Sequence, residues 1–257
     1  MSILTLDKVS KAFGGLTAVS DVSLHVNSKE LVGLIGPNGA GKTTLFNLIT
    51  GVYTPTSGKI LLASDGGTTE ISGMKPYKIS DLGIARTFQN IRLFANRTVL
   101  DNVLMAMHSK QGVGIVHSLL RTPQFYRNQR ALEEEAVKLL ALFSLEDYKN
   151  EKAKNLPYGQ QRCLEIVRAL ATHPKVLFLD EPAAGMNPNE TSDLKKLIRM
   201  IQKEFQISVV LIEHDMSLVM DICERIYVLE YGKVIAEGTP KEVQQNPKVI
   251  QAYLGGV

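Results

Sequence analysis

The sequence predicts an α/β fold that combines a mostly parallel sheet, an N-terminal antiparallel β part and an inserted helical subdomain. Three observations lead to this prediction. The glycine-rich stretch GPNGAGKTT follows an apolar strand pattern and precedes an apolar helical one. Two short and almost wholly apolar runs, KVLFLDEP and ISVVLIEHD, end in polar residues, as strands buried on both faces of a parallel sheet do. Between about Asn90 and Leu156, apolar residues recur at helical spacing instead.

Composition narrows the classes of function. The 257 residues suffice for one large α/β domain or for a core domain with a smaller one attached. The net charge is only +3 and no long run of Lys or Arg occurs, so we expect no nucleic-acid partner. Cys163 and Cys223 stand singly in apolar patterns and are expected in the core. Unpaired cysteines of this kind suit a protein in a reducing compartment. No signal-peptide pattern and no run of about 18 apolar residues occurs, so the chain is expected in the cytoplasm.

The first half of the chain supplies strands around one helix. Alternating patterns predict strands at ILTLDKV, VSLHV and LVGLIG, with the turn-rich AFGGL between the first two. The run LVGLI leads through GPNGAGKTT into LFNLITGV, which predicts a helix. SGKILL and IARTF predict two further strands.

Helical patterns follow. VLDNVLMAM and RALEEEAVKLLALF predict helices, and KQGVGIVHSLLRTPQFYRNQ between them has no clear period and predicts an irregular or partly helical excursion. NLPYGQQRCLEIVRALA predicts a third helix with one apolar face. That face is formed by Cys163, Leu164, Val167, Leu170 and Ala171, whereas Gln160, Gln161, Arg162 and Arg168 fall largely elsewhere.

The last part of the chain returns to α/β alternation. TSDLKKLIRMIQKEF predicts a helix before ISVVLIEHD, and IYVLEYGKVIAEG predicts a hairpin. In TPKE, Thr239, Pro240 and Glu242 form the pattern of a capping box that opens a closing helix. We therefore divide the chain into an N-terminal part of the core at 1–89, with the antiparallel strands and the glycine-rich stretch, a helical subdomain at 90–156, and a part at 157–257 with the LPYGQQ helix, the second half of the core and the C-terminal helix.

Gly36 to Thr43 fit the phosphate-loop pattern GxxxxGK[ST], with the required strand before it and helix after it. The glycines allow backbone N–H groups to turn toward phosphate oxygens. Lys42 would neutralise charge on the β- and γ-phosphates, and the Thr43 hydroxyl would bind Mg²⁺. A glycine-rich turn with a lone lysine is the alternative, and this context disfavours it.

Asp180 and Glu181 stand where the strand VLFLD ends. Such a pair is by itself usually only the polar start of a loop. A phosphate loop, however, needs a carboxylate on the metal side, which Asp180 can supply from the edge of a buried strand. Adjacent residues point in different directions, so Glu181 can reach an attacking water as general base.

Phe13, Gln89 and His214 carry little signal singly but gain weight as a set. In the order Phe13, GPNGAGKTT, Gln89, LPYGQQ, VLFLDE and His214, nearly the whole chain resembles the ATP-binding cassette (ABC) ATPases, which share a phosphate-loop NTPase core. It looks closest to the ATPase subunits of branched-chain amino-acid importers, which carry similar LPYGQQR and DEPAAGMNP segments.

The resemblance implies a role for each residue. Phe13 would stack on adenine, Asp180 would hold Mg²⁺, Glu181 would polarise the water and His214 would contact the γ-phosphate. Gln89 would touch Mg²⁺ or the water and sense a transmembrane partner. Phosphates would be bound by Gly36, Pro37, Asn38, Gly39, Ala40, Gly41, Lys42, Thr43 and Thr44. The ATP held by a second, head-to-tail cassette would meet Leu156, Pro157, Tyr158, Gly159 and Gln160.

Two stretches depart from the family pattern. Pro157 and Tyr158 replace the Ser and the first Gly of Leu-Ser-Gly-Gly-Gln, which removes a hydroxyl and a backbone donor. Ala-Gly-Met-Asn at 184–187 replaces Ser-Ala-Leu-Asp, so an amide stands where the family often has a carboxylate. From residues alone, Leu156 to Gln161 is either only a helix cap or half of an anion-binding site.

The resemblance implies a cytoplasmic ATPase subunit that energises an importer, using ATP and Mg²⁺. Its implied partners are membrane permease subunits, a second ABC ATPase subunit and, indirectly, a solute-binding protein. The second ATPase subunit is either identical to this one or different, and we prefer a different one. Alternatives are the ATPase of an exporter of lipid or lipopolysaccharide, a soluble cassette that acts in translation or DNA repair, and a nucleotide-binding regulator without hydrolysis. The intact Glu181 argues against the last.

Overall fold

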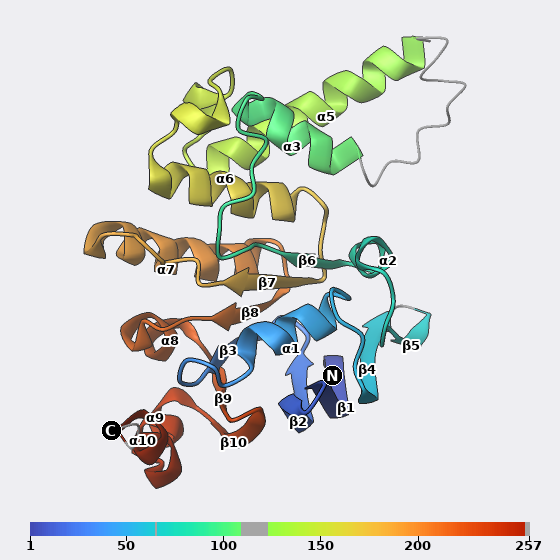
Figure 1. Ribbon diagram of the computed structural model, residues 1–257. Helices are drawn as coiled ribbons and strands as arrows, with labels where there is room; N and C mark the ends of the chain where they lie inside the picture. The colour runs from blue at the N-terminus through green and yellow to red at the C-terminus, as the bar shows by residue number, and fades with distance from the viewer. Residues whose placement is uncertain (65, 109–122, 255–257) are drawn as a thin grey trace. The chain divides into compact units, whose positions relative to one another are not determined.

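The computed structural model describes residues 1–64, 66–108 and 123–254 (Figure 1). Contacts group the chain into two compact units. Unit 1 comprises Met1–Arg86 and Lys175–Val257, and unit 2 comprises Thr87–Pro174. The division into consecutive segments at 1–89, 90–156 and 157–257 stays a prediction. The compact units have different ends, and the LPYGQQ helix belongs to unit 2.

Unit 1 contains an antiparallel sheet with the strand order β2-β1-β4-β5. Along β1 and β2 buried residues recur near every second position, because one face of these strands packs on the core. This confirms the predicted N-terminal antiparallel part. Its strands are β1 (Ser2–Phe13), β2 (Leu16–Asn27), β4 (Ser57–Ser64) and β5 (Gly67–Glu70).

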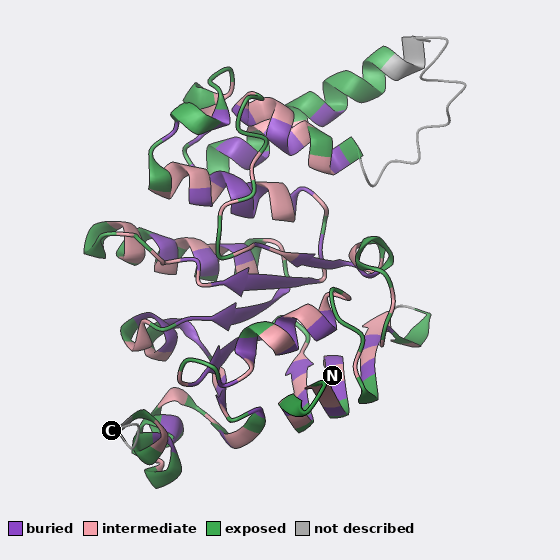
Figure 2. Cartoon of the chain, in the orientation of Figure 1, coloured by how far each residue is buried: buried purple, intermediate pink, exposed green. Residues whose placement is uncertain are grey.

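The second sheet of unit 1 has the order β10-β9-β3-β8-β7-β6, and only the β9–β10 pair is antiparallel. Three neighbouring strands of this sheet, β3, β8 and β7, are buried at every residue (Figure 2). The prediction of a mostly parallel buried sheet is confirmed. The strands are β3 (Leu31–Ile35), β6 (Ile84–Arg86), β7 (Val176–Asp180), β8 (Ser208–Ile212), β9 (Arg225–Glu230) and β10 (Lys233–Gly238).

The helices of unit 1 follow the predicted alternation. The helix expected at LFNLITGV begins three residues earlier, at Lys42 inside the phosphate loop, and ends at Ile49. The capping box of Thr239 and Glu242 is confirmed, because each side chain accepts the backbone N–H of the other residue. The helices are α1 (Lys42–Ile49), α2 (Pro76–Asp81), α7 (Pro188–Glu204), α8 (Met216–Ile222), α9 (Pro240–Gln245) and α10 (Pro247–Leu254).

Unit 2 is helical where it is described. Its helices are α3 (Val99–His108), α5 (Pro123–Leu142) and α6 (Tyr158–Leu170), with short 3₁₀ turns at Glu146–Tyr148 and Ala153–Asn155. Most of the irregular excursion expected at 110–129 lies outside the described residues, and its last part is helical from Pro123. Arg162, which the periodicity places away from the apolar face of α6, is fully buried too, because α6 is covered on more than that face.

An aromatic contact joins α1 to the parallel sheet. Phe46 on α1 and Phe178 on β7 are both fully buried, with ring centroids 4.9 Å apart in an edge-to-face arrangement. Edge-to-face pairs add stability beyond the area they bury. Lys42 begins α1 and Asp180 ends β7, so the contact between the two rings also fixes the elements that carry Lys42 and Asp180. No helix in the described part of the chain is long and apolar enough to cross a membrane.

We expect Phe46→Ala to lower the free energy of unfolding by about 3–5 kcal/mol, because it leaves a cavity beside Phe178 that the surrounding structure cannot fill. Urea and thermal unfolding, followed by circular dichroism, measure this loss. As a control, Tyr77→Ala removes a side chain that is 60% exposed and should change stability by no more than about 0.5 kcal/mol. Equal losses in the two variants would contradict the role given to the Phe46 contact.

Candidate functional site

The phosphate loop connects β3 to α1 through backbone conformations that require glycine. Gly41, directly before α1, has φ of +102°, and a Cβ at this residue would stand 2.6 Å from the carbonyl oxygen of Ala18. A side chain at Gly36, where φ is +150°, would clash with the carbonyl oxygen of Leu229. Glycine is the residue that adopts such conformations without steric cost. The loop can therefore lie tightly against β2 and β9 while α1 starts at Lys42.

Lys42 is bound by the loop that precedes it. Its ammonium donates hydrogen bonds to the carbonyl oxygens of Gly36, at 2.7 Å, and Pro37, at 3.0 Å. Burial lowers the pKa of Lys42, and the negative charges of Glu181 and Asp180 oppose this effect. The ammonium thus lies within the field of both carboxylates that the sequence associates with the phosphate loop.

Asp180 ends β7 and is 3% exposed. Its Oδ2 accepts a 2.6 Å hydrogen bond from Nη2 of Arg86, the last residue of β6. The other terminal nitrogen of Arg86 donates to Asn47 Oδ1 on α1, also at 2.6 Å. The sequence analysis missed Arg86. Its only signal was a cation at the end of a predicted strand, and its partner lies 94 residues away in the sequence.

Glu181 and His214 meet at the ends of neighbouring parallel strands. Glu181 Oε1 lies 2.8 Å from His214 Nε2. Residue 181 has φ of +49°, a left-handed conformation that costs free energy for a residue other than glycine and occurs often at functional sites. Its N–H donates to the carbonyl oxygen of Ile212, the last residue of β8. This turn brings the carboxylate beside the imidazole that follows β8 by two residues.

Glu213 holds together the two loops that carry this pair. Its buried carboxylate accepts backbone N–H groups from Ala183 at 2.7 Å, from His214 at 3.0 Å and from Asp215 at 3.4 Å. Burial raises the pKa of Glu213, the three N–H groups oppose this shift, and the nearby charge of Glu181 adds to it. The sequence analysis missed Glu213 because it read the residue only as a polar strand end.

A cavity of about 340 Å³ brings most of the predicted residues of unit 1 together. Glu181, His214 and Tyr231 line it, and so does the phosphate loop from Asn38 to Thr44. Its rim at Leu16–Ala18 belongs to the start of β2. Phe13, predicted to stack on adenine, does not line this cavity. It packs edge-on against Tyr53, with ring centroids 5.2 Å apart.

The Asn187 position, where the family often has Asp, has a structural role of its own. Asn187 caps α7, and its Oδ1 accepts the N–H groups of Asn189 at 2.9 Å and Glu190 at 3.0 Å. The carboxylate of Glu190 accepts the N–H of Asn187 in return. This capping box works equally well with an amide or a carboxylate at residue 187.

The remaining predicted residues lie in unit 2. Gln89 is exposed, and Leu156 is buried beside the start of α6. No side chain of a described residue caps α6, whose N-cap is Pro157. Its first intrahelical bond runs from Gln161 N–H to the carbonyl oxygen of Pro157, so the N–H groups of residues 158–160 precede the helix ladder. These groups and the helix dipole make the start of α6 suited to an anion.

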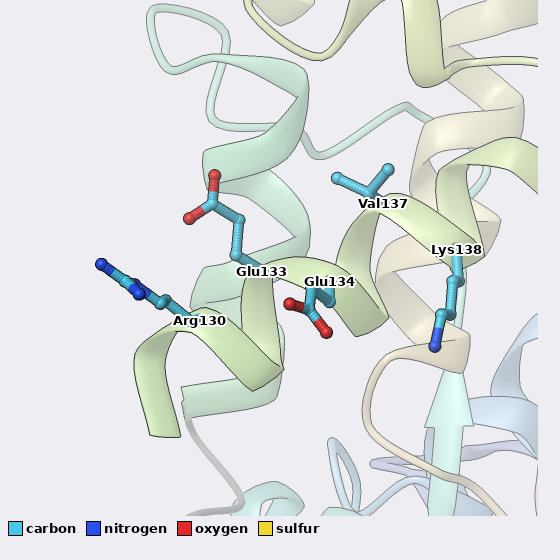
Figure 3. Close-up of a pocket in the computed structure, with 5 residues that line it drawn as sticks. All are labelled: Arg130, Glu133, Glu134, Val137 and Lys138. Atoms are coloured by element: carbon cyan, nitrogen blue, oxygen red, sulfur yellow. The ribbon is translucent and has the colours of Figure 1, made fainter. Parts of the chain in front are cut away.

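Unit 2 also has a hollow of about 520 Å³ along α5 (Figure 3). Its described lining is mostly charged and consists of Arg130, Glu133, Glu134, Val137 and Lys138. None of the predicted site residues is among them. Solvated charges of both signs on one helix face are typical of an exposed surface.

The oxygen donors near the phosphate loop fit Mg²⁺. Mg²⁺ is usually bound by one or two protein oxygens together with substrate phosphates and waters, rather than by a cage of side chains. Thr43 in the cavity and Asp180 at the strand edge supply such oxygens. No group of three or more His, Cys, Asp or Glu suited to a metal occurs among the described residues.

Two family descriptions match the chain. Residues 19–184 match "ABC transporter", and residues 233–257 match "Branched-chain amino acid ATP-binding cassette transporter".

Curated relatives cover nearly the full length. The chain is 47% identical to the high-affinity branched-chain amino acid transport ATP-binding protein BraF of Pseudomonas aeruginosa and 46% identical to LivG of Escherichia coli K12. Each alignment covers 98% of both sequences. Identity is 36% to the lipopolysaccharide export system ATP-binding protein LptB of Haemophilus influenzae, over 99% of this chain and 98% of that protein.

Solved structures of ATP-binding cassettes superimpose on nearly the whole chain. The ADP conformation of MJ1267, an ATP-binding cassette of an ABC transporter, superimposes with a TM-score of 0.83 at 32% identity and 99% coverage of both chains. The ATP-binding cassette MJ0796, in a dimeric post-hydrolysis state bound to ADP and Pi, superimposes with a TM-score of 0.75 at 25% identity. That alignment covers 92% of this chain and 98% of that one.

We expect Glu213→Gln to slow hydrolysis of ATP because the amide offers one acceptor and one donor to three converging N–H groups. Leaving a buried N–H without its acceptor costs about 1–3 kcal/mol, so the loops of Glu181 and His214 should shift. Steady-state ATPase assays should give a turnover about 10-fold lower, with a thermal midpoint lowered by a few degrees. The control Glu204→Gln changes an exposed acid at the end of α7 and should match the wild type. Wild-type turnover of Glu213→Gln would contradict this role.

Proposed function

This chain belongs to the family of ABC transporter ATP-binding proteins, and from that premise we propose that it is the ATP-hydrolysing subunit of an importer for branched-chain or related amino acids. The observation that carries the proposal is its 46–47% identity, over 98% of its length, to ATP-binding subunits of high-affinity branched-chain amino acid transport. The match of residues 233–257 to the branched-chain cassette description supports the same class of solute.

The geometry of unit 1 supports hydrolysis of ATP as the reaction. In our proposal the phosphate loop binds the phosphates of ATP, and Lys42 exchanges the carbonyl oxygens of Gly36 and Pro37 for phosphate oxygens. Glu181 accepts the proton of the attacking water, and His214 beside it contacts the γ-phosphate. Thr43 and Asp180 would hold Mg²⁺, which neutralises charge that develops on the phosphate oxygens. Phe13, on β1, would contact the base.

Partners follow from the family and from unit 2. We propose that a second cassette closes head to tail on this one, so that the N–H groups at the start of α6 meet the ATP held by that partner. The dimeric state of MJ0796 supports pairing with a second cassette. Gln89, exposed in unit 2, would contact Mg²⁺ or the water and face a membrane permease. A solute-binding protein would act through that permease. We propose that this subunit lies on the cytoplasmic face of the membrane and that the two cassettes of a pair are different chains.

The competing functions have weaker support. Identity to the lipopolysaccharide exporter subunit is 36%, about ten percentage points below the identity to the amino acid importers. Proteins of this family that act in translation or DNA repair have two cassettes in tandem or carry coiled-coil inserts. In this chain the family description matches one stretch, residues 19–184. Co-purification from membranes would separate these functions. A leucine-type binding protein among the partners supports import of amino acids, whereas a lipid-handling partner contradicts it.

Glu181→Gln should preserve binding of ATP and reduce its hydrolysis by roughly 100- to 10,000-fold, which is the usual contribution of a positioned general base. Nucleotide binding, measured by equilibrium titration, and turnover, measured by phosphate release, distinguish the two effects. Lys42→Ala serves as the comparison and should abolish binding, because the phosphates lose their main protein cation. Near-normal turnover of Glu181→Gln would remove Glu181 from the mechanism.

Gly159 should be the sensitive position at the start of α6. Gly159→Asp places a carboxylate where phosphate is expected, and like charges about 4 Å apart repel by roughly 1–4 kcal/mol. The ATPase activity of the assembled transporter should fall by about tenfold or more. Pro157→Ser adds a hydroxyl to a helix that already works through backbone N–H groups, so it should be tolerated. Loss of activity in the serine variant would contradict this view of α6.

A further inference from the structure

Residues 88–92, called here the Gln89 segment, are fastened to α6 within unit 2 through their backbone. Nη1 of Arg162 donates to the carbonyl oxygen of Phe88 at 2.6 Å, and Nη2 donates to that of Gln89 at 2.7 Å. Nη1 also binds Glu165 Oε2 at 2.9 Å. The other oxygen of Glu165 accepts the N–H of Arg92 at 3.2 Å and that of Phe88 at 3.4 Å. Donors and acceptors of the segment are thus both bound by two side chains that stand three residues apart on α6.

These two side chains form a deeply buried ion pair. Arg162 is 0% exposed and Glu165 is 2% exposed, whereas Gln89 is exposed. Arg162 and Glu165 bind backbone groups of Phe88, Gln89 and Arg92. The fork of a guanidinium suits this task because it presents two parallel donors in a fixed plane.

Such a pair is a poor means of stabilising a fold. Removing two charges from water costs several kcal/mol per ion, and apolar residues of similar volume often serve stability as well or better. Moreover, Nε of Arg162 is buried and has no hydrogen-bond partner in the part of the chain that the structure describes. The geometry that the pair imposes on the Gln89 segment is thus the better explanation of its presence.

We propose that Arg162 and Glu165 form a clasp that makes the Gln89 segment and the first turn of α6 move together. This inference rests on the proposed function, in which a membrane permease contacts the Gln89 segment and the start of α6 meets the ATP of a second cassette. Arg162 and Glu165 are then positioning residues. A displacement of the segment by the permease reaches Gly159 through the clasp, and closure around ATP reaches the permease by the same route.

The short path favours this transmission. Arg162 follows Gly159 by three residues, which is less than one helical turn, about 4.5 Å along the axis. Nη2 of Arg162 also lies 3.4 Å from the hydroxyl of Tyr158, the first residue of α6. A rigid helix therefore leaves little freedom between the clasp and the N–H groups at its start, and one guanidinium contacts both the segment and that first turn.

The test compares variants of the full-length subunit assembled with its permease subunits in proteoliposomes, with a leucine-loaded binding protein as the stimulus. The variants are Arg162→Gln, Arg162→Lys and Glu165→Gln. The measured quantity is the ratio of stimulated to unstimulated ATPase activity. We expect Arg162→Gln and Glu165→Gln to lower this ratio about tenfold, in the range of typical coupling free energies. Arg162→Lys should recover only part of it, because an ammonium lacks the planar fork that reaches both carbonyl oxygens.

Arg130→Gln is the control, because it removes an exposed arginine from α5 in the same unit. It should keep the wild-type ratio. If Arg162→Gln and Arg130→Gln lower the ratio equally, or if the Arg162 and Glu165 variants keep it, the clasp is refuted.

Hydrogen exchange of the isolated subunit supplies a second measurement. Glu165→Gln should speed exchange of the Phe88 and Arg92 amides about tenfold or more, and leave the amides of β3 and β8 unchanged. Unchanged exchange at Phe88 and Arg92 would refute the clasp even if the variant lost stimulation. If the wild-type transporter shows no stimulation by leucine-loaded protein, the proposed function fails, and the exchange result still decides whether the clasp exists.

Discussion

The parallel pairing of β3, β8 and β7 is the constraint on which the site of unit 1 depends. Leu34 pairs with Ile212, and Ile212 pairs with Asp180, so the three strands end at the same edge of the sheet. Every residue of these strands is buried, which fixes their register because a slip would leave apolar side chains without a partner surface. The phosphate loop, Glu181 and His214 follow these ends directly and therefore share one cavity.

Charge in this buried region is balanced by specific partners. Asp180 binds Arg86. Lys42 binds carbonyl oxygens of its own loop in the field of the two carboxylates. A buried ion whose partner is missing costs several kcal/mol, so each of these groups depends on the others. The arrangement of Lys42, Asp180 and Arg86 therefore ties the phosphate loop to β6 and β7 without any contribution from a ligand.

The elements of the fold could be predicted from the sequence because periodicity reports burial directly. VLFLD and SVVLI read as buried strands, and the glycine pattern located the phosphate loop between strand and helix. Arg86, Arg162 and Glu213 could not be recognised this way. None of them belongs to a motif, and each has a partner far along the chain: 94 residues away for Arg86, 73 or 74 for the carbonyl oxygens that Arg162 binds, and 30 for the Ala183 N–H that Glu213 accepts. Periodicity also gave no sign that Arg162 is buried, because apolar spacing reports only the apolar part of a buried surface.

Three of the residues that the sequence did not reveal share one chemical task. Glu213 accepts backbone N–H groups of the loops after β7 and β8, while Glu165 and Arg162 bind N–H and carbonyl groups of the Gln89 segment. Loops have no ladder of hydrogen bonds to fix them, and a buried backbone group needs a partner. A buried charged side chain can supply several such bonds at once, and each is stronger than a bond between neutral groups. In this chain the loops that carry Glu181, His214 and Gln89 are therefore held by these buried charged side chains. The buried side chains determine the positions of the residues proposed to react, although they are not part of the motifs that identify the family.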